Sequence, residues 1–116
     1  MIDTLNIIAA LMTIAFGAFG FLAPRHTAKA LDLTTNGSTM GLSELRASVG
    51  GLFVVMAIAC IILNDPMAYA TMGFAYAGAT LGRFVSIVLD KPPIAKALVF
   101  GGIEAALALW LIAANL

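Results

Sequence analysis

The residues of this sequence that could do chemistry are charged side chains placed within long apolar stretches. Arg83 and Glu104 stand inside two successive stretches, and Glu44 and Arg46 stand near the start of an earlier one. A charge near the centre of a bilayer costs about 3 kcal/mol on insertion scales, so such residues usually face the protein interior and have partners. These four residues are therefore the first candidates for a functional site.

Arg83 and Glu104 are placed at depths that allow them to meet. With a rise of about 1.5 Å per residue, Glu104 lies roughly 15 Å into its helix and Arg83 roughly 10 Å from the nearer end of its own. An arginine side chain is long enough to span the difference, and an unpaired charge at that depth is costly. We predict an ion pair between Arg83 and Glu104.

Glu44 and Arg46 cannot form a second pair with each other. Residues two apart on a helix point about 200° away from one another, so both cannot face the interior. Ser43 is predicted to cap the helix, which would place Glu44 in the first turn, where the helix dipole favours it. Arg46 has two alternatives: it extends to lipid phosphates, or it turns inward past Gly50 and joins Arg83.

Small and polar residues recur at helical spacing along each stretch. The stripe of the first stretch is Asn6, Ala10, Thr13, Gly17 and Gly20. In the third stretch Tyr76 and Thr80 share the face of Arg83, and in the fourth Gly101 shares the face of Glu104. In the second, Glu44, Ala47, Ser48 and Gly51 form the stripe. Such stripes mark helix contacts in lipid, so they are either packing seams or the wall of a cavity. The predicted ligand-binding or buried polar cluster comprises Glu44, Arg46, Tyr76, Thr80, Arg83 and Glu104.

No reaction centre can be assembled from the remaining residues. The chain has one histidine, His26, in a polar connection and one cysteine, Cys60, in an apolar run. A histidine-ligated haem, a metal site, a Ser-His-Asp set and a phosphate-binding glycine loop therefore all lack their residues. We predict that the protein is not an enzyme and carries no metal or other cofactor.

The composition places these residues in a membrane protein. Of 116 residues, 62% are hydrophobic and only 10% are charged, whereas soluble domains carry about 25% charged residues. Four apolar stretches, at about 5–23, 43–63, 67–89 and 94–114, each approach the roughly 20 residues that span hydrocarbon. Short connections make neighbouring helices antiparallel. We predict a single all-α domain over 1–116, a transmembrane antiparallel up-down four-helix bundle.

Turn residues separate the predicted helices. Asp65 is expected to cap the third helix with Pro66 in its first turn. The connection 24–42 begins with basic and apolar residues that favour a short interfacial helix, and then continues into Thr34-Thr35-Asn36-Gly37-Ser38, which favours a loop.

The basic residues set the predicted orientation. All six fall on one side of the predicted bundle: Arg25, Lys29, Arg46, Arg83, Lys91 and Lys96. Positive charge stays on the cytoplasmic side of a membrane. The connection 24–42 is therefore predicted to be cytoplasmic and both termini periplasmic.

Three segments together resemble a known family. The run Ser43-Glu44-Leu45-Arg46-Ala47-Ser48-Val49-Gly50-Gly51, the run Leu81-Gly82-Arg83, and Glu104 are similar to an uncharacterised bacterial family of four-helix membrane proteins, broadly the DoxX-like group. The resemblance implies a bacterial inner-membrane location and the polar positions Glu44, Arg46, Arg83 and Glu104. It implies no mechanism.

Two functions fit these observations. The first is a non-catalytic accessory or scaffolding bundle whose small-residue faces dock a membrane protein partner or a second copy of the chain. The alternative is binding or transport of a small amphiphile, lipid head group or anion through an interior lined by Tyr76, Arg83 and Glu104. A zero formal net charge gives no basis for a nucleic acid partner.

Overall fold

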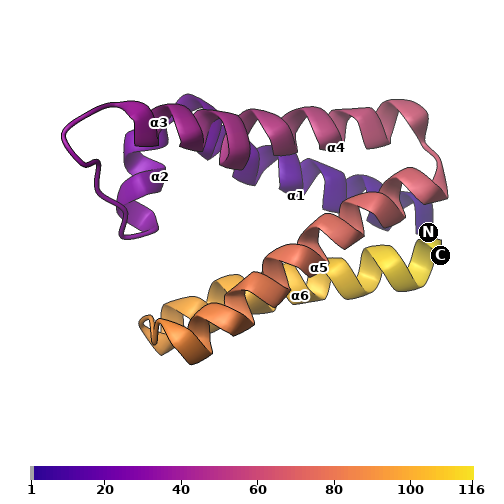
Figure 1. The fold of residues 1–116 in the computed structure, drawn as a ribbon. Helices are drawn as coiled ribbons and strands as arrows, with labels where there is room; N and C mark the ends of the chain where they lie inside the picture. Colours follow the sequence, from indigo (N-terminus) through magenta and orange to yellow (C-terminus); the bar gives the residue numbers. More distant parts are fainter. Residues whose placement is uncertain (1) are drawn as a thin grey trace. The chain divides into compact units, whose positions relative to one another are not determined.

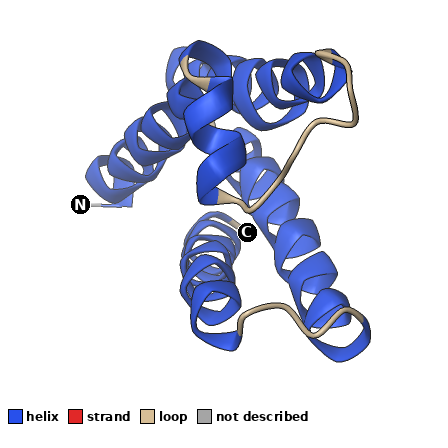
Figure 2. Ribbon diagram, turned by 90° about the vertical axis from the view of Figure 1, so that its left-hand side faces the viewer, coloured by secondary structure: helices blue, strands red, loops and turns tan. Residues whose placement is uncertain are grey.

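The computed structural model describes residues 2–116, and the described residues form helices joined by short loops, with no strand among them (Figure 2). Residues 3–62 and 63–116 form two compact units, and Figure 1 follows the chain through both from α1 to α6. We call them the first and the second unit.

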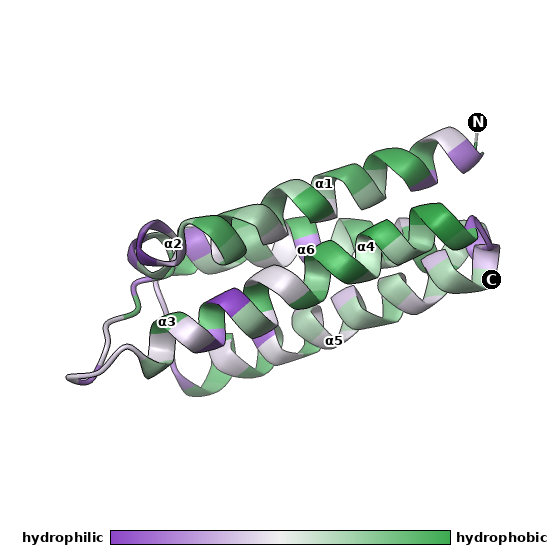
Figure 3. Ribbon diagram, turned by 90° about the horizontal axis from the view of Figure 1, so that it is seen from above, coloured by the Kyte–Doolittle hydropathy of each residue, from purple (hydrophilic) through white to green (hydrophobic). Residues whose placement is uncertain are grey.

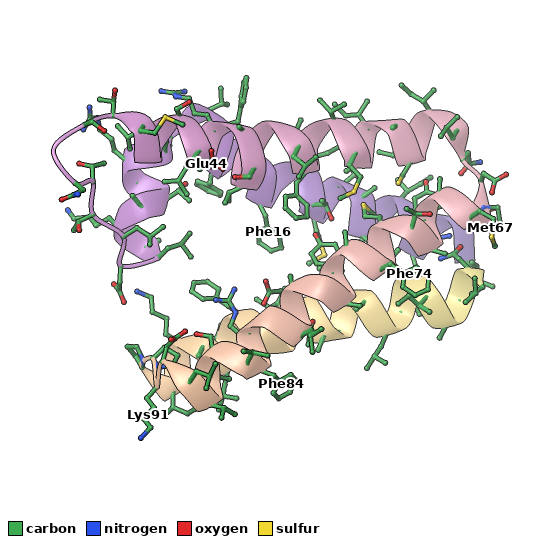
Figure 4. The ribbon with its side chains drawn as sticks, viewed as in Figure 1. Phe16, Glu44, Met67, Phe74, Phe84 and Lys91 are labelled. Carbon is green, nitrogen blue, oxygen red and sulfur yellow. The ribbon has the colours of Figure 1, made fainter. Side chains whose placement is uncertain are left out.

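Four helical segments are long and apolar enough to cross a membrane: Ile2–Leu22, Met40–Leu63, Pro66–Leu89 and Ile94–Asn115. They occupy the same parts of the chain as the four predicted spans. Much of their surface is apolar, most clearly along α1 (Ile2–Leu22) and α4 (Leu52–Leu63) (Figure 3). Phe74 and Phe84 project away from their helix (Figure 4) and are 54% and 61% exposed. Lipid is the solvent that suits such a surface, and the protein is a multi-pass membrane protein.

The first unit contains α1, α2 (Pro24–Ala30), α3 (Met40–Glu44), η1 (Leu45–Gly51) and α4. The segment η1 is π-helical, and it continues α3 into α4 without a break. Helix α2 is the short helix expected in the connection 24–42, and the predicted loop follows it.

Backbone-to-backbone contact holds α1 against η1. A Cβ added at Gly50 would lie 2.8 Å from the carbonyl carbon of Gly20, and one added at Gly17 would lie 2.9 Å from Val54 Cγ2. Gly20 therefore meets Gly50, and the earlier residue Gly17 meets the later residue Val54, so α1 and the second span run antiparallel. Small residues allow this close approach, as they do between helices in lipid. The buried stripe Asn6, Ala10, Thr13, Gly17 and Gly20 on α1 is the one predicted.

The predicted stripe of the second span is wrong in part. Glu44 and Ala47 are exposed and Ser48 and Gly51 are half-buried, whereas the buried residues are Leu45, Gly50, Ala57 and Cys60. The stripe assumed a period of 3.6 residues, and the π-helical turns of η1 bond each residue to one five positions away, which rotates the later residues relative to the earlier ones.

The predicted cap of the second span is also wrong. The helix begins at Met40, earlier than expected, so Ser43 lies inside it, and its backbone N–H donates to Thr39 O. The Ser38 hydroxyl instead accepts a hydrogen bond from the Met40 N–H at 3.3 Å.

The second unit is an antiparallel hairpin of α5 (Pro66–Leu89) and α6 (Ile94–Asn115). A Cβ at Gly73 would lie 2.8 Å from Leu111 Cβ, and one at Gly101 would lie 3.1 Å from Arg83 Cγ, so the two helices approach closely at two levels. The predicted cap is confirmed: Asp65 Oδ1 accepts from the Met67 N–H at 2.7 Å, and Pro66 occupies the first turn. Asp65 thereby satisfies one of the free donors of the helix start.

Candidate functional site

Arg83 and Glu104 form the predicted ion pair between α5 and α6. Arg83 Nε donates to Glu104 Oε1 at 3.1 Å, and Nη2 donates to Oε2, also at 3.1 Å. The two planar groups therefore meet in the two-bond arrangement that suits arginine and carboxylate. The Arg83 and Glu104 side chains are 32% and 19% exposed, so the pair is partly buried.

Two residues of α6 that the sequence reasoning did not assign to this pair also contact Arg83. The guanidinium carbon lies 5.6 Å from the centre of the Phe100 ring, within the range of a cation–π interaction. The absence of a side chain at Gly101 leaves room for the aliphatic stem of Arg83. A signal existed in the sequence, because Phe100 and Glu104 are four residues apart and so share one face of the helix.

Tyr76 and Thr80 lie on the buried side of α5, but the Thr80 hydroxyl is engaged within the helix. It donates to Tyr76 O at 2.9 Å, and the Tyr76 side chain is 7% exposed. Threonine commonly makes this bond to the carbonyl four residues earlier. The structure thus brings Tyr76, Thr80, Arg83 and Glu104 together on one hairpin.

Glu44 and Arg46 belong to the first unit, and both are exposed. Ser48 follows Glu44 by four residues, and its hydroxyl donates to Glu44 O at 2.7 Å and to Glu44 Oε2 at 3.2 Å. Glu44 is labelled in Figure 4. This contact is local to one helix, so it does not extend the group on the second unit.

Arg46 makes a contact that neither sequence alternative contained. Its Nη1 donates to Phe21 O at 2.6 Å. Phe21 stands in the last turn of α1, where the final carbonyls have no partner within the helix and a positive charge is favoured. Arg46 therefore stabilises the end of α1, and the close approach of Gly50 to Gly20 places it there.

Comparison with protein families identifies the chain. A family model, Domain of unknown function (DUF4345), matches residues 2–115, which is almost its whole length. The chain belongs to the DUF4345 family. The searches of curated proteins and of solved structures returned no match. Membership of DUF4345 agrees with the expected resemblance to an uncharacterised family, and nothing in the match is specific to the DoxX-like group.

No group of three or more side chains suited to bind a metal ion occurs in residues 2–116 of this DUF4345 protein. The chemistry that its described charged residues offer is ion pairing and recognition of anions. Arg83 is matched to a carboxylate, whereas Arg46 is bonded to a backbone carbonyl.

Proposed function

We propose that this protein is a non-catalytic accessory or scaffolding protein of the bacterial inner membrane. Its two helical hairpins assemble into an antiparallel up-down four-helix bundle like that of the DoxX-like group. Its surface docks a membrane protein partner or a second copy of the chain. The connection 24–42 faces the cytoplasm, and both termini face the periplasm.

The Arg83–Glu104 pair is the observation that carries this proposal. Both carboxylate oxygens of Glu104 accept from Arg83, so the carboxylate is occupied in a role that joins two helices. A specific charged contact of this kind fixes the register of neighbouring helices in lipid. Phe100 and Gly101 fit the arginine on the same hairpin, which supports a structural role for the charges.

The distribution of basic residues supports the proposed orientation. Within the first unit, Arg25 and Lys29 lie in α2, between its two spans. Within the second unit, Lys91 lies in the connection between α5 and α6 and points outward (Figure 4). Each hairpin thus carries basic residues at its connection, as expected for cytoplasmic segments.

The test compares the full-length wild type with Arg83→Gln, Glu104→Gln and the exchanged double variant Arg83→Glu/Glu104→Arg, all purified in mild detergent. Each single variant should lose about 1.5–3 kcal/mol of unfolding free energy, the range for a hydrogen bond to a charged group. The exchanged variant should recover part of the loss. Lys91→Gln is the control, since Lys91 is an exposed cation in a connection.

Native mass spectrometry of the same samples tests the function itself. We expect the wild type and Lys91→Gln to retain a defined membrane protein partner or a second copy, and the single variants to retain less of it. The alternative is that Tyr76, Arg83 and Glu104 hold a small amphiphile, lipid head group or anion. A small molecule that the wild type retains and both single variants lose would establish that alternative and refute the structural role.

A further inference from the structure

A cavity of about 720 Å³ lies within the first unit, where the end of α1, the helix α2 and the start of the span Met40–Leu63 come together. Pockets that bind small molecules commonly measure about 300–1,000 Å³. All of the residues that line this cavity belong to residues 22–46. It is separate from the Arg83–Glu104 pair, so an inference from it does not rest on the proposed accessory role.

The charged side chains that line the cavity are cationic. Arg25 and Arg46 are among its lining residues, beside the ring of His26, and no carboxylate is found among the described residues that line it. Two acidic residues are near in sequence. Glu44 accepts a hydrogen bond from Ser48, and Asp32 lies in the connection beyond α2. Because neither of these carboxylates lines the cavity, the charge that faces it is positive.

The guanidinium groups retain donors for a ligand. Arg46 uses Nη1 on Phe21 O, and an arginine has five N–H donors in all. The contact with Phe21 holds the guanidinium in place without neutralising it. Arg25 forms no ion pair within the described part of the chain. The hydroxyl-bearing residues Thr39 and Ser43 also line the cavity.

Apolar residues also line the cavity, and one of them is exposed at the end of the apolar helix α1. Leu22, Pro24 and Leu42 line the cavity, and Leu22 is 71% exposed at the end of α1. On the same helix the Phe19 ring contacts the His26 ring at 6.0 Å between centroids. A ligand with an anionic head and an apolar tail would therefore meet both of its chemistries here.

We propose that this cavity binds a phosphate group, with the two arginines as its principal ligands. Arginine favours phosphate because its planar fork of N–H donors matches two phosphate oxygens at once. An anionic lipid supplies that phosphate at a membrane surface, where basic juxtamembrane residues are attracted to it. Free inorganic phosphate has the same recognition chemistry, and the test separates the two sources.

The experiment uses the full chain in detergent after lipid removal. One arm reconstitutes it into nanodiscs of phosphatidylcholine alone or of phosphatidylcholine with phosphatidylglycerol, and counts retained lipids by native mass spectrometry after release. The other arm measures inorganic phosphate binding by equilibrium dialysis. The variants are Arg25→Gln and Arg46→Gln. The matched control is Lys29→Gln, an exposed cation of α2 that does not line the cavity.

We expect wild type and Lys29→Gln to retain phosphatidylglycerol and both arginine variants to bind it about tenfold more weakly or worse, because a hydrogen bond to a charged group is worth about one decade in affinity. Arg46→Gln also removes the contact with Phe21, so circular dichroism checks its helix content. Arg25→Gln leaves that contact intact and tests the site by itself.

Each outcome is decisive. Selective loss of phosphatidylglycerol in the arginine variants supports a lipid head group. Loss of inorganic phosphate alone in the same variants supports a phosphate site with a soluble ligand. Equal binding by Arg25→Gln and Lys29→Gln, or no binding of either probe by the wild type, overturns the proposal.

Discussion

Replacing Gly50 with alanine tests the packing that defines the first unit. The added Cβ would lie 2.8 Å from the carbonyl carbon of Gly20 and closer still to the backbone of Phe21. Non-bonded carbon atoms prefer about 3.5–4.0 Å. The obstacle is backbone and cannot rotate away, so α1 and η1 must separate by about 1 Å to restore ordinary contact distances.

The expected change in the free energy of unfolding is the balance of two effects. Overpacking of this kind costs about 1–3 kcal/mol, and alanine in a helix regains up to about 1 kcal/mol relative to glycine. The clash is with backbone, which cannot rotate away, so the upper end of the cost applies and Gly50→Ala should destabilise the first unit by about 2 kcal/mol, about 3 less the gain of about 1. Gly102→Ala is the matched control, because a Cβ there would meet no atom within 4 Å; it should be neutral or stabilising.

Cys60 provides the assay. It is the single cysteine of the chain, it lies on α4 of the first unit, and it is 4% exposed. Its rate of reaction with N-ethylmaleimide in detergent reports how often the unit opens. A loss of about 1.4 kcal/mol corresponds to tenfold faster labelling. If Gly50→Ala reacts no faster than Gly102→Ala, the close approach of α1 and η1 is refuted.

Three further predictions concern Asp65, Lys91 and Gly101, and detergent unfolding tests each of them. Asp65→Ala should lower stability by about 1 kcal/mol through loss of the α5 cap, and Asp65→Asn should retain most of it. Lys91→Gly should raise stability by up to about 1 kcal/mol, because Lys91 has a positive φ of 50°, which costs about that much in a non-glycine residue; equal or lower stability would contradict this. Gly101→Val should weaken the packing of α5 on α6 and lower stability, because the new side chain crowds the Arg83 stem. Gly78 faces open space, so Gly78→Val should lower stability less.

The sequence predicted the features that depend on local rules. Asp65 caps α5 as expected because a cap needs only the residue type and the turn that follows it. The pairing of Arg83 with Glu104 followed from their depths and from the cost of an unpaired charge, since a fixed rise per residue places the two charges on neighbouring antiparallel helices at similar heights. Both the cap and the ion pair depend on only a few residues, so the sequence was enough to predict them.

The errors arise where backbone geometry departs from a regular helix. The π-helical segment η1 changes which residues of the second span face α1. The predicted stripe contained Gly51, whereas Gly50 is the buried glycine that packs against α1. The same geometry brings Arg46 to Phe21 O. A reading at a period of 3.6 residues cannot anticipate either result, because nothing in residue type alone signals the extra residue in the turn.

The different partners of the two arginines separate a structural role from a binding role. Glu104 supplies a full negative charge that neutralises Arg83, so an incoming anion would have to displace a carboxylate. Phe21 O supplies only a backbone dipole to Arg46, so the charge remains available, and Arg25 adds a second beside the same cavity. Anion recognition is therefore expected at the arginine without a carboxylate. Arg25→Gln and Lys91→Gln each remove one positive charge, but only Arg25 lines the cavity. Arg25→Gln alone should therefore weaken binding of phosphatidylglycerol, a result that a change in net charge would not produce.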